Sequence, residues 1–509
     1  MSDDNFLKSI DCTLGLCKWL ILQISLYFLM PYMWNYEYAF GTIVLICLYT
    51  SLYVAYWNFV DKAKRTRWLL LPYMLYLAIV AIFFITINNW ITSVWFGVFL
   101  PLYGIICFLC VKLFRKYSKK FRKRIKYGRA ITYTIIIVFF FVLKTLSVLW
   151  MCQEHKSLDR EKNDIIERKN YLVEKLVTSP KNILNEMPTA IGVQFQGEWA
   201  LYSCSMLSAA LVNLSTLYPE TKDENILYID SLISIVMSPE IRYYDKMRWG
   251  EDPLESLDEN NSHVSYLSHL AWMICGYRKI SGNHKYDELL TNLCEAMNRR
   301  ILKSSSMNLP TYPGESIYVP DMLVAIVALN QYAETHKGKY RSTVTKWITK
   351  AQKDWLDKET GVLASFIDEN GFLYEDAPIK GSYSALSCYY LTLIDDTFAK
   401  SQYQQLKTLF WKEGIISGLK EYWDRACYVG IDIDAGPIVF ELGPSGTAFY
   451  AGSSTYFGDH NVRKEILSTA EMAGHTIKIG NKRHYLLSNI ALVGESIMLA
   501  MRTNYDFPQ

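Results

Sequence analysis

The stretch VSYLSHLAWMICGYRKISGNHKYDELL, residues 264 to 290, decides the fold class. It joins a largely apolar run to an amphipathic run through a few polar and glycine residues, which predicts a helical hairpin with a tight turn. Similar short connections recur near 335, 395 and 457, so hairpins return roughly every 60 residues. First helices are expected to begin near Trp199, Ser262, Val319, Tyr383, Pro444 and His484, and second helices near Glu224, Tyr286, Tyr340, Ser401 and Asn461.

Helical hairpins of this length cannot bury their apolar stripes alone, so they stack into an open solenoid or a closed ring. The count stops near six pairs and no polar capping repeat is apparent. These observations favour a closed (α/α)6 toroid, or barrel, which spans residues 181 to 509 of an all-α chain. An irregular all-helical domain is the alternative.

The longer connections lead into the first helix of each pair, and they contain many Tyr, Trp, Asp and Glu residues. They cover 242–263, 308–321, 371–383 and 421–445. Because connections of one kind lie at one end of such a ring, the functional groups are expected at that end.

The first 152 residues predict a membrane domain of five helices. Five apolar segments are long enough to cross a bilayer, and they cover about 14–36, 39–59, 68–88, 90–113 and 130–151. The strongly basic connections, 61–67 and 112–129, are expected in the cytoplasm by the positive-inside rule. This topology leaves the N-terminus inside and the C-terminal domain outside.

The charge balance differs between these two parts. The formal net charge is +3, but without the basic stretch 112–129 the chain is slightly acidic. A nucleic-acid partner is therefore not expected, and the basic stretch is interpreted as facing anionic lipid headgroups. The partners expected are the lipid bilayer and a small apolar or glycan substrate, with a homo-oligomer left open.

A highly charged helix is predicted between the membrane domain and the barrel, within residues 153 to 180, and is interpreted as a rigid stalk or a short coiled coil. The six cysteines from Cys152 onward contain no CxxC pair, so neither a metal site nor a cofactor is expected there. Cys204, Cys275, Cys294 and Cys388 fall within helical patterns and are expected to be small core residues.

Candidate catalytic residues lie near the long connections. His269 is placed on a first helix, and Asp321 stands at the start of another, where it either caps the helix or works chemically. Glu315 shares the loop before Asp321. Asp432 and Asp434 point to the same side if their segment is extended, so one of their pKa values is expected to be raised. The same pair alternatively stiffens the loop or binds Ca²⁺.

Aromatic residues of these loops are expected to form the wall of a substrate site, which suits sugar stacking and apolar ligands equally. They are Tyr243, Tyr244, Trp249, Tyr312, Tyr383 and Trp423.

The stretches RWGEDPLESLDENNSHVSYLSHLAWMICGYRKISGNHKYDELL and PGESIYVPDMLVAIVALNQYAETHKGKYRS resemble the bacterial linalool dehydratase/isomerase family. The likeness covers most of 190–500. It implies an (α/α)6 barrel that isomerises and dehydrates a terpene alcohol without metal or organic cofactor, with His269 on a histidine that lines the active site. Tyr312 and Asp321 stand where that family has its catalytic cysteine pair.

The sequence therefore predicts a membrane-anchored, extracytoplasmic lyase or isomerase acting on an isoprenoid or other lipid-like alcohol. The predicted location is a bacterial inner (cytoplasmic) membrane, with the barrel on the periplasmic or extracellular side. One alternative is a glycan-active enzyme of the cell envelope, a glycoside hydrolase, polysaccharide lyase or uronate epimerase. The other is a non-enzymatic, membrane-tethered ligand-binding protein.

Overall fold

The computed structural model describes residues 158 to 506, apart from 188–194, 375–378, 415, 428, 433, 475, 486–487 and 489–491, and it also describes 135, 138 and 142. The chain forms two compact units, Met1–Ser147 and Val148–Gln509. All five predicted membrane spans lie outside the described residues, except for Ile135, Val138 and Val142, which are helical and exposed. The membrane domain and its topology stay predictions.

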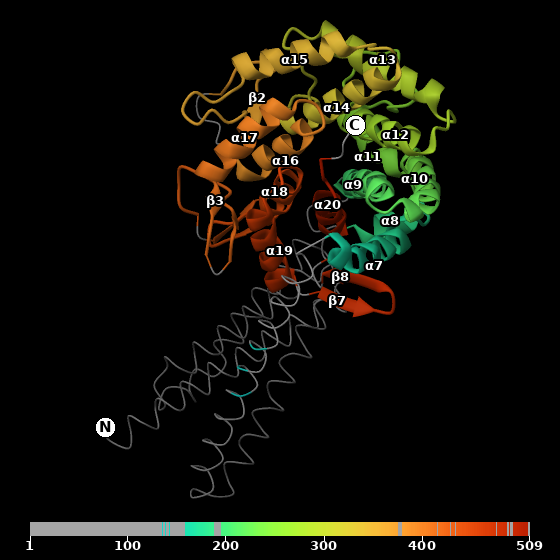
Figure 1. The fold of residues 1–509 in the computed structure, drawn as a ribbon. Coiled ribbons are helices and arrows are strands. Elements are labelled where there is room, and N and C mark those ends of the chain that lie inside the picture. The colour runs from blue at the N-terminus through green and yellow to red at the C-terminus, as the bar shows by residue number, and fades with distance from the viewer. Residues whose placement is uncertain are drawn as a thin grey trace, which may run out of the picture. The chain divides into compact units, whose positions relative to one another are not determined.

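The second unit is built around a closed inner ring of helices. Its members are α9 (Gln196–Leu217), α12 (Val264–Ser281), α14 (Val319–Thr335), α16 (Gly381–Leu391), α18 (Pro444–Tyr456) and α20 (Leu492–Arg502). Each packs against the next, and α20 packs back against α9 (Figure 1). The predicted all-α toroid is thereby confirmed, and the open solenoid is not what forms.

An outer layer of helices covers this ring. It comprises α7 (Leu158–Leu176), α10 (Lys222–Val236), α13 (Asp287–Lys303), α15 (Arg341–Asp354), α17 (Asp396–Leu409) and α19 (His460–Gly474). Each of the last five packs on the inner helix that precedes it in the chain, and α7 packs on α20. The short helices α8 (Pro180–Glu186) and α11 (Pro239–Trp249) and the 3-10 turn Pro219–Thr221 lie beside α9.

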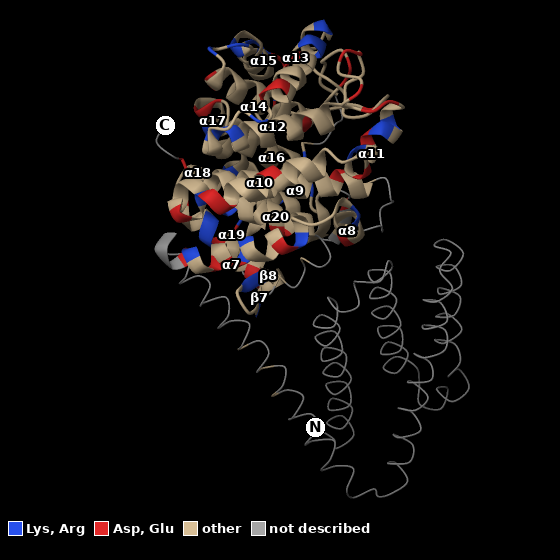
Figure 2. Ribbon diagram, turned by 90° about the vertical axis from the view of Figure 1, so that its right-hand side faces the viewer, with Lys and Arg blue, Asp and Glu red and all other residues tan. Residues whose placement is uncertain are grey.

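The two layers differ in composition for a physical reason. The inner helices are surrounded by protein, so helix α14 buries almost every residue from Val319 to Ala333. Outer helices such as α13 and α15 have one apolar face and expose the other, and Figure 2 marks the charged residues along them in blue and red. Gly452 of α18 permits close contact with α20, because a Cβ there would lie 2.4 Å from the Met501 sulfur.

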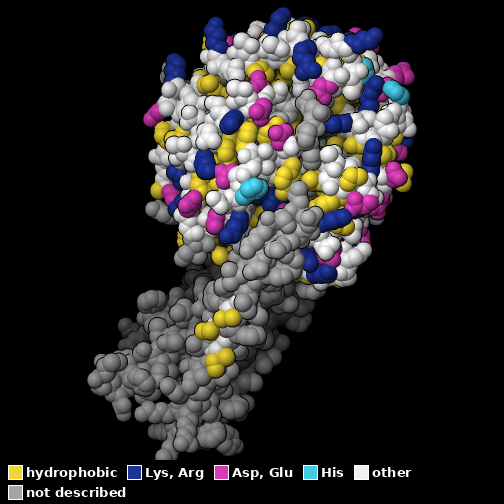
Figure 3. Space-filling model, viewed as in Figure 1, with side chains coloured by type: hydrophobic (Ala, Val, Ile, Leu, Met, Phe, Trp, Pro, Cys, Tyr) yellow, Lys and Arg dark blue, Asp and Glu magenta, His cyan; other side chains and the backbone are white. Residues whose placement is uncertain are grey.

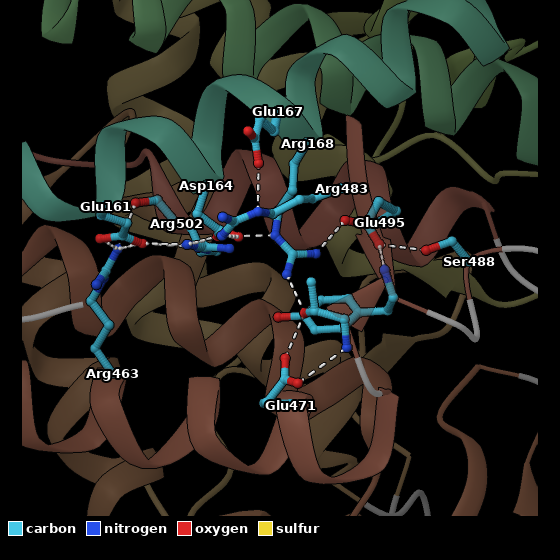
Figure 4. Close-up of polar contacts among 12 residues, drawn as sticks. Glu161, Asp164, Glu167, Arg168, Arg463, Glu471, Arg483, Ser488, Glu495 and Arg502 are labelled. Carbon is cyan, nitrogen blue, oxygen red and sulfur yellow. Dashed lines mark hydrogen bonds and ion pairs between the residues drawn. The ribbon is translucent and has the colours of Figure 1, made fainter. Parts of the chain in front are cut away.

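The helix predicted to be a stalk is instead part of the barrel. Helix α7 completes the outer layer, and its side chains Glu161, Asp164 and Arg168 are buried. Figure 4 shows the reason: these charges pair with residues of α19, of the segment 476–485 and of α20. Asp164, for example, lies 2.6 Å from Arg502 and 3.1 Å from Arg483. A charge-rich helix was interpreted as solvent-facing, whereas its charges neutralise one another inside.

Four antiparallel ribbons lie in the connections that lead into inner helices. They pair β1 (Ile317–Tyr318) with β2 (Phe366–Ile367), β3 (Trp411–Lys412) with β4 (Gly418–Leu419), β5 (Val429–Asp432) with β6 (Gly436–Val439), and β7 (Thr476–Ile479) with β8 (Lys482–Tyr485). The predicted helix start at His484 is wrong, since a tight turn at Gly480 and Asn481 pairs this segment as a hairpin. We call the end of the ring where the inner helices begin the mouth.

Several smaller predictions are settled by burial. Cys204, Cys275, Cys294 and Cys388 are free and buried, as expected of core residues.

Among the described residues, α9 alone is long and apolar enough to cross a membrane, but 67% of its most apolar window is buried inside the protein. It serves here as an inner helix. The surface of the barrel mixes charges of both signs with scattered apolar side chains (Figure 3).

Candidate active site

Asp321 lies at the mouth, on the first turn of α14. It does not cap the helix: Tyr318 occupies the cap position, and the Asp321 carboxylate accepts a 2.6 Å hydrogen bond from the Thr311 hydroxyl. Burial raises its pKa from 3.8 to about 6, the charges of Asp434 and Glu315 add to the shift, and Thr311 opposes it. The residue therefore exchanges its proton near neutral pH.

Glu198 is the second carboxyl group of the mouth, and the sequence analysis missed it. It is the third residue of α9, as Asp321 is the third residue of α14. Burial raises its pKa from 4.5 to about 7, and the charge of Asp321 raises it further, while Tyr312 and Arg248 oppose the shift. Its Oε2 atom is buried without a well-directed hydrogen bond among the described residues. An acidic residue in the first turn of two inner helices was the signal that would have found it.

Tyrosines surround these two carboxyl groups. Tyr202 lies one turn after Glu198, and its hydroxyl is 3.1 Å from that of Tyr390. Burial raises the pKa of Tyr202, and the charges of Asp321 and Glu198 raise it further, so the hydroxyl stays protonated. The rings of Tyr318 and Tyr383 meet at 5.8 Å. The mouth is thus lined by aromatic faces and by neutral hydroxyl groups.

His269 borders the same cluster from α12. It is 2% exposed, its Nδ1 atom lies 2.8 Å from the Ser205 hydroxyl, and its ring lies 4.7 Å from that of Tyr202. Burial lowers its pKa to about 3, so the imidazole is neutral at physiological pH. The ring of Tyr202 is the contact of His269 with the cluster, and burial is the cause of the shift in the His269 pKa.

The two aspartates of the β5–β6 ribbon do not form the expected proton-sharing pair. Lys380 binds both, at 2.8 Å from Asp432 and 3.4 Å from Asp434. Burial alone would raise the pKa of Asp432, but Lys380 and two backbone N–H donors lower it below 3.8. Those donors belong to Asp434 and Ala435, at 2.9 and 3.1 Å, so Asp432 stiffens the turn. Asp434 is more exposed and acts on Tyr383 as a hydrogen-bond partner.

The remaining predicted residues divide between the mouth and other places. Glu315 is 40% exposed on its side chain and pairs loosely with Arg248 at 3.6 Å. Tyr312 and Tyr383 do belong to the aromatic wall, since both respond to the charges of the mouth carboxylates.

Four aromatic residues of the predicted wall are placed differently. Tyr244 is buried and hydrogen-bonds Ser265, and its pKa is raised by burial and then by Asp245 and Glu198. Tyr243 is 56% exposed to solvent. Trp249 packs against buried His263 at 5.4 Å, and Trp423 packs on the hydrophobic core. Tyr243, Trp249 and Trp423 support the loops around the mouth or face solvent, whereas Tyr244 lies close enough to the cluster to respond to Glu198.

Glu421 is a useful comparison, because burial raises its pKa from 4.5 to about 7 as well. Both of its oxygens are occupied, however, by the backbone N–H and the hydroxyl of Ser382, at 3.2 and 2.7 Å. It holds the start of α16. Among the described residues, no group of three His, Cys, Asp or Glu side chains is placed to hold a metal ion.

A cavity of about 490 Å³ opens at the opposite end of the ring, beside the turn between α18 and α19. Its lining includes Tyr403, Asp459 and His460. Its one carboxylate among these residues, Asp459, is already engaged by Lys407 and by the Tyr403 hydroxyl.

No protein-family model matches the chain, and no curated protein is significantly similar to it. Among solved structures, a family 105 glycoside hydrolase of C. acetobutylicum ATCC 824 aligns with 12% identity and a TM-score of 0.41, over 59% of this chain and 92% of its own. The GH76A α-1,6-mannanase of Salegentibacter sp. HEL1_6 aligns with 13% identity and a TM-score of 0.39, over 65% and 98%. Likenesses this distant give no argument about chemistry, which must come from the mouth itself.

Proposed function

We propose that the mouth is the active site of a glycan-active enzyme that works by acid/base chemistry. The observation that carries this proposal is the pair of half-buried carboxyl groups, Glu198 and Asp321, at corresponding positions of two inner helices. The charge of Asp321 raises the pKa of Glu198, so the pair holds one proton over a range near neutral pH. Two carboxyl groups with separated pKa values are the usual machinery for cleaving a glycosidic bond.

The two roles follow from the order of the pKa values. Glu198, with its pKa near 7, keeps its proton longest and is assigned as the general acid that protonates the leaving-group oxygen. Asp321, with its pKa near 6, is ionised at pH 7 and is assigned to activate a water molecule or to attack the sugar carbon. In both routes the C–O bond breaks as the leaving oxygen takes the Glu198 proton.

The surroundings of the pair suit a sugar. Tyr312, Tyr318 and Tyr383 offer flat apolar faces for stacking and hydroxyl groups for hydrogen bonding. A protein that only binds its ligand has no need for two carboxyl groups with strongly raised pKa values. The non-enzymatic alternative is therefore the least supported of the three.

A second candidate is the chemistry of the linalool dehydratase/isomerase family, which the sequence resembles. Its specific support is His269, a neutral buried imidazole packed between Tyr202 and Trp272, with ring distances of 4.7 and 6.2 Å. In that case Glu198 protonates the hydroxyl group of an allylic alcohol, the C–O bond breaks with loss of water, and ionised Asp321 removes a proton from the carbon skeleton to form the alkene. The membrane domain predicted for residues 1–152 would place such an enzyme near a lipid-like substrate.

The test is a product screen with the full-length chain. One arm offers a panel of defined oligosaccharides, and the other offers acyclic terpene alcohols, with products identified by mass spectrometry. We expect glycan cleavage that falls by a factor of about 10² to 10⁴ in Glu198→Gln and in Asp321→Asn. Glu421→Gln is the matched control, since Glu421 has a similar pKa but lies outside the acid/base pair.

The screen decides between the candidates. Alkene or isomer formation from the alcohols, with the glycans intact, favours the second candidate. Glycan cleavage that both carboxyl variants leave unchanged refutes the assignment of the pair.

A further inference from the structure

Arg248 lies beside the carboxyl pair, in the last turn of α11. Its guanidinium group is stacked over the ring of Tyr312 at 4.1 Å and lies 5.5 Å from that of Phe195. The side chain is only 23% exposed, and its charge acts on Glu198. A cation is therefore held in a fixed orientation at the edge of the proposed active site.

This guanidinium group is poorly paired for one so enclosed. Among the described residues it makes no hydrogen bond, and its ion pair with Glu315 is long, at 3.6 Å. Arg300 shows the usual arrangement, because it donates hydrogen bonds to backbone carbonyls of the 256–262 loop, at 2.8 to 3.2 Å. Enclosed arginines normally use their donors. Arg248 is held by stacking and by the long ion pair with Glu315, and its N–H groups remain available to a ligand.

We infer that Arg248 binds an anionic group of the substrate, a carboxylate or a phosphate ester. The planar guanidinium fork matches two oxygens of either group, and the stacked ring of Tyr312 fixes its plane. Glu315 takes the place of the ligand in this structure. Its ion pair with Arg248 is long and its side chain is 40% exposed, so breaking the pair costs little free energy when an anion with better geometry binds. The kind of molecule that carries the anion, a glycan, rests on the proposed function.

The position of Arg248 defines how such a substrate lies. Tyr312 contacts Arg248 on one side and acts on Glu198 on the other. An acidic sugar whose anion meets Arg248 is thus aligned with the proton of Glu198. Lys380 is also a cation near the carboxyl cluster, but Asp432 and Asp434 already bind it.

The test measures binding to the full-length chain on three matched sets of glycans. The first set contains oligosaccharides of uronic acids, the second contains the same oligosaccharides after reduction of the carboxyl groups to alcohols, and the third contains phosphorylated oligosaccharides. Inorganic phosphate serves as a competitor. We expect at least one acidic set to bind about tenfold or more tightly than its neutral counterpart, as charge-assisted hydrogen bonds require.

The variants assign this preference to one side chain. Arg248→Gln is expected to abolish the preference for acidic glycans. Arg248→Lys keeps the positive charge and the aliphatic part of the side chain, so it is expected to retain part of the preference. Glu315→Gln is expected to strengthen acidic binding severalfold, because the internal competitor is gone. Lys246→Gln, a change on the same helix at a side chain that is 49% exposed, is expected to have no effect.

The outcomes are separable. Preference for uronates or for phosphate esters identifies the source of the anion, and both support the inference. Equal binding of acidic and neutral sets, no binding of any acidic member, or a preference that survives in Arg248→Gln overturns it. If acidic glycans bind through Arg248 but are never cleaved, the proposed function fails while the inference stands.

Discussion

Replacing Glu198 by glutamine should make the protein more stable at alkaline pH while it removes activity. The folded chain raises the pKa of this carboxyl group from 4.5 to about 7, so folding favours the protonated form. That preference corresponds to about 3 kcal/mol of stability that the wild-type protein loses as the pH rises through this range. The amide that replaces the carboxyl group does not ionise, so the variant keeps that stability.

The sign of the effect follows from proton binding. Below the unfolded pKa both states carry the proton, and the wild type and the variant are expected to be about equally stable. Between 4.5 and about 7 the folded wild type binds more protons than the unfolded chain, so its stability falls with rising pH. Above that range the variant is expected to be more stable by up to about 3 kcal/mol.

The assay is thermal or denaturant unfolding of the full-length chain, followed by tryptophan fluorescence at about pH 5 and about pH 8. Asp432→Asn is the control of opposite sign, because Lys380 and two backbone N–H groups lower the pKa of Asp432. That variant should be less stable than the wild type at the higher pH, with a smaller difference in acid. If the difference in unfolding free energy between the wild type and Glu198→Gln did not change with pH, burial would not be what raises the pKa of Glu198.

Three further predictions concern the mouth and the ring. Turnover should peak between about pH 6 and 7, because Asp321 must be ionised and Glu198 protonated, and a flat pH–rate profile would contradict the pair. Asp164→Asn should cost about 3 to 5 kcal/mol of unfolding free energy, since it breaks a buried charge network, and a loss under about 1 kcal/mol would mean that α7 contributes little to ring closure. Gly381→Ala should lower the melting temperature, because its Cβ would lie 2.1 Å from the carbonyl oxygen of Lys420, and an unchanged value would contradict that close approach.

Periodicity predicted most of the ring, because each inner helix is apolar on all sides and each outer helix on one. The predicted starts at Val319 and Pro444 coincide with those of α14 and α18. The same reasoning failed for α7. Its inward face carries Glu161, Asp164 and Arg168 at helical spacing, and a sequence does not reveal that these charges meet partners from α19 and α20, some 300 residues later.

The candidate site could be predicted where an acidic residue stood at the start of an inner helix, beside an aromatic loop. Asp321 stood at the start of an inner helix in an aromatic loop, and the structure places it at the mouth. Glu198 was overlooked because no long acidic and aromatic loop precedes it. Asp432 was given a chemical role because alternation placed it beside Asp434, whereas the distant Lys380 decides its charge. Local pattern gives the place of a carboxyl group, and only tertiary contacts give its pKa.

The central claim is that Glu198 donates a proton and Asp321 acts as base or nucleophile. It is tested most directly by comparing, for each variant, an unactivated glycoside of the sugar found in the screen with its dinitrophenyl glycoside, whose leaving group needs no protonation. We expect Glu198→Gln to lose cleavage of the unactivated substrate but to keep the first-turnover release of dinitrophenol, and Asp321→Asn to lose both. Equal losses on both substrates in the Glu198 variant, or wild-type turnover in the Asp321 variant, would contradict it.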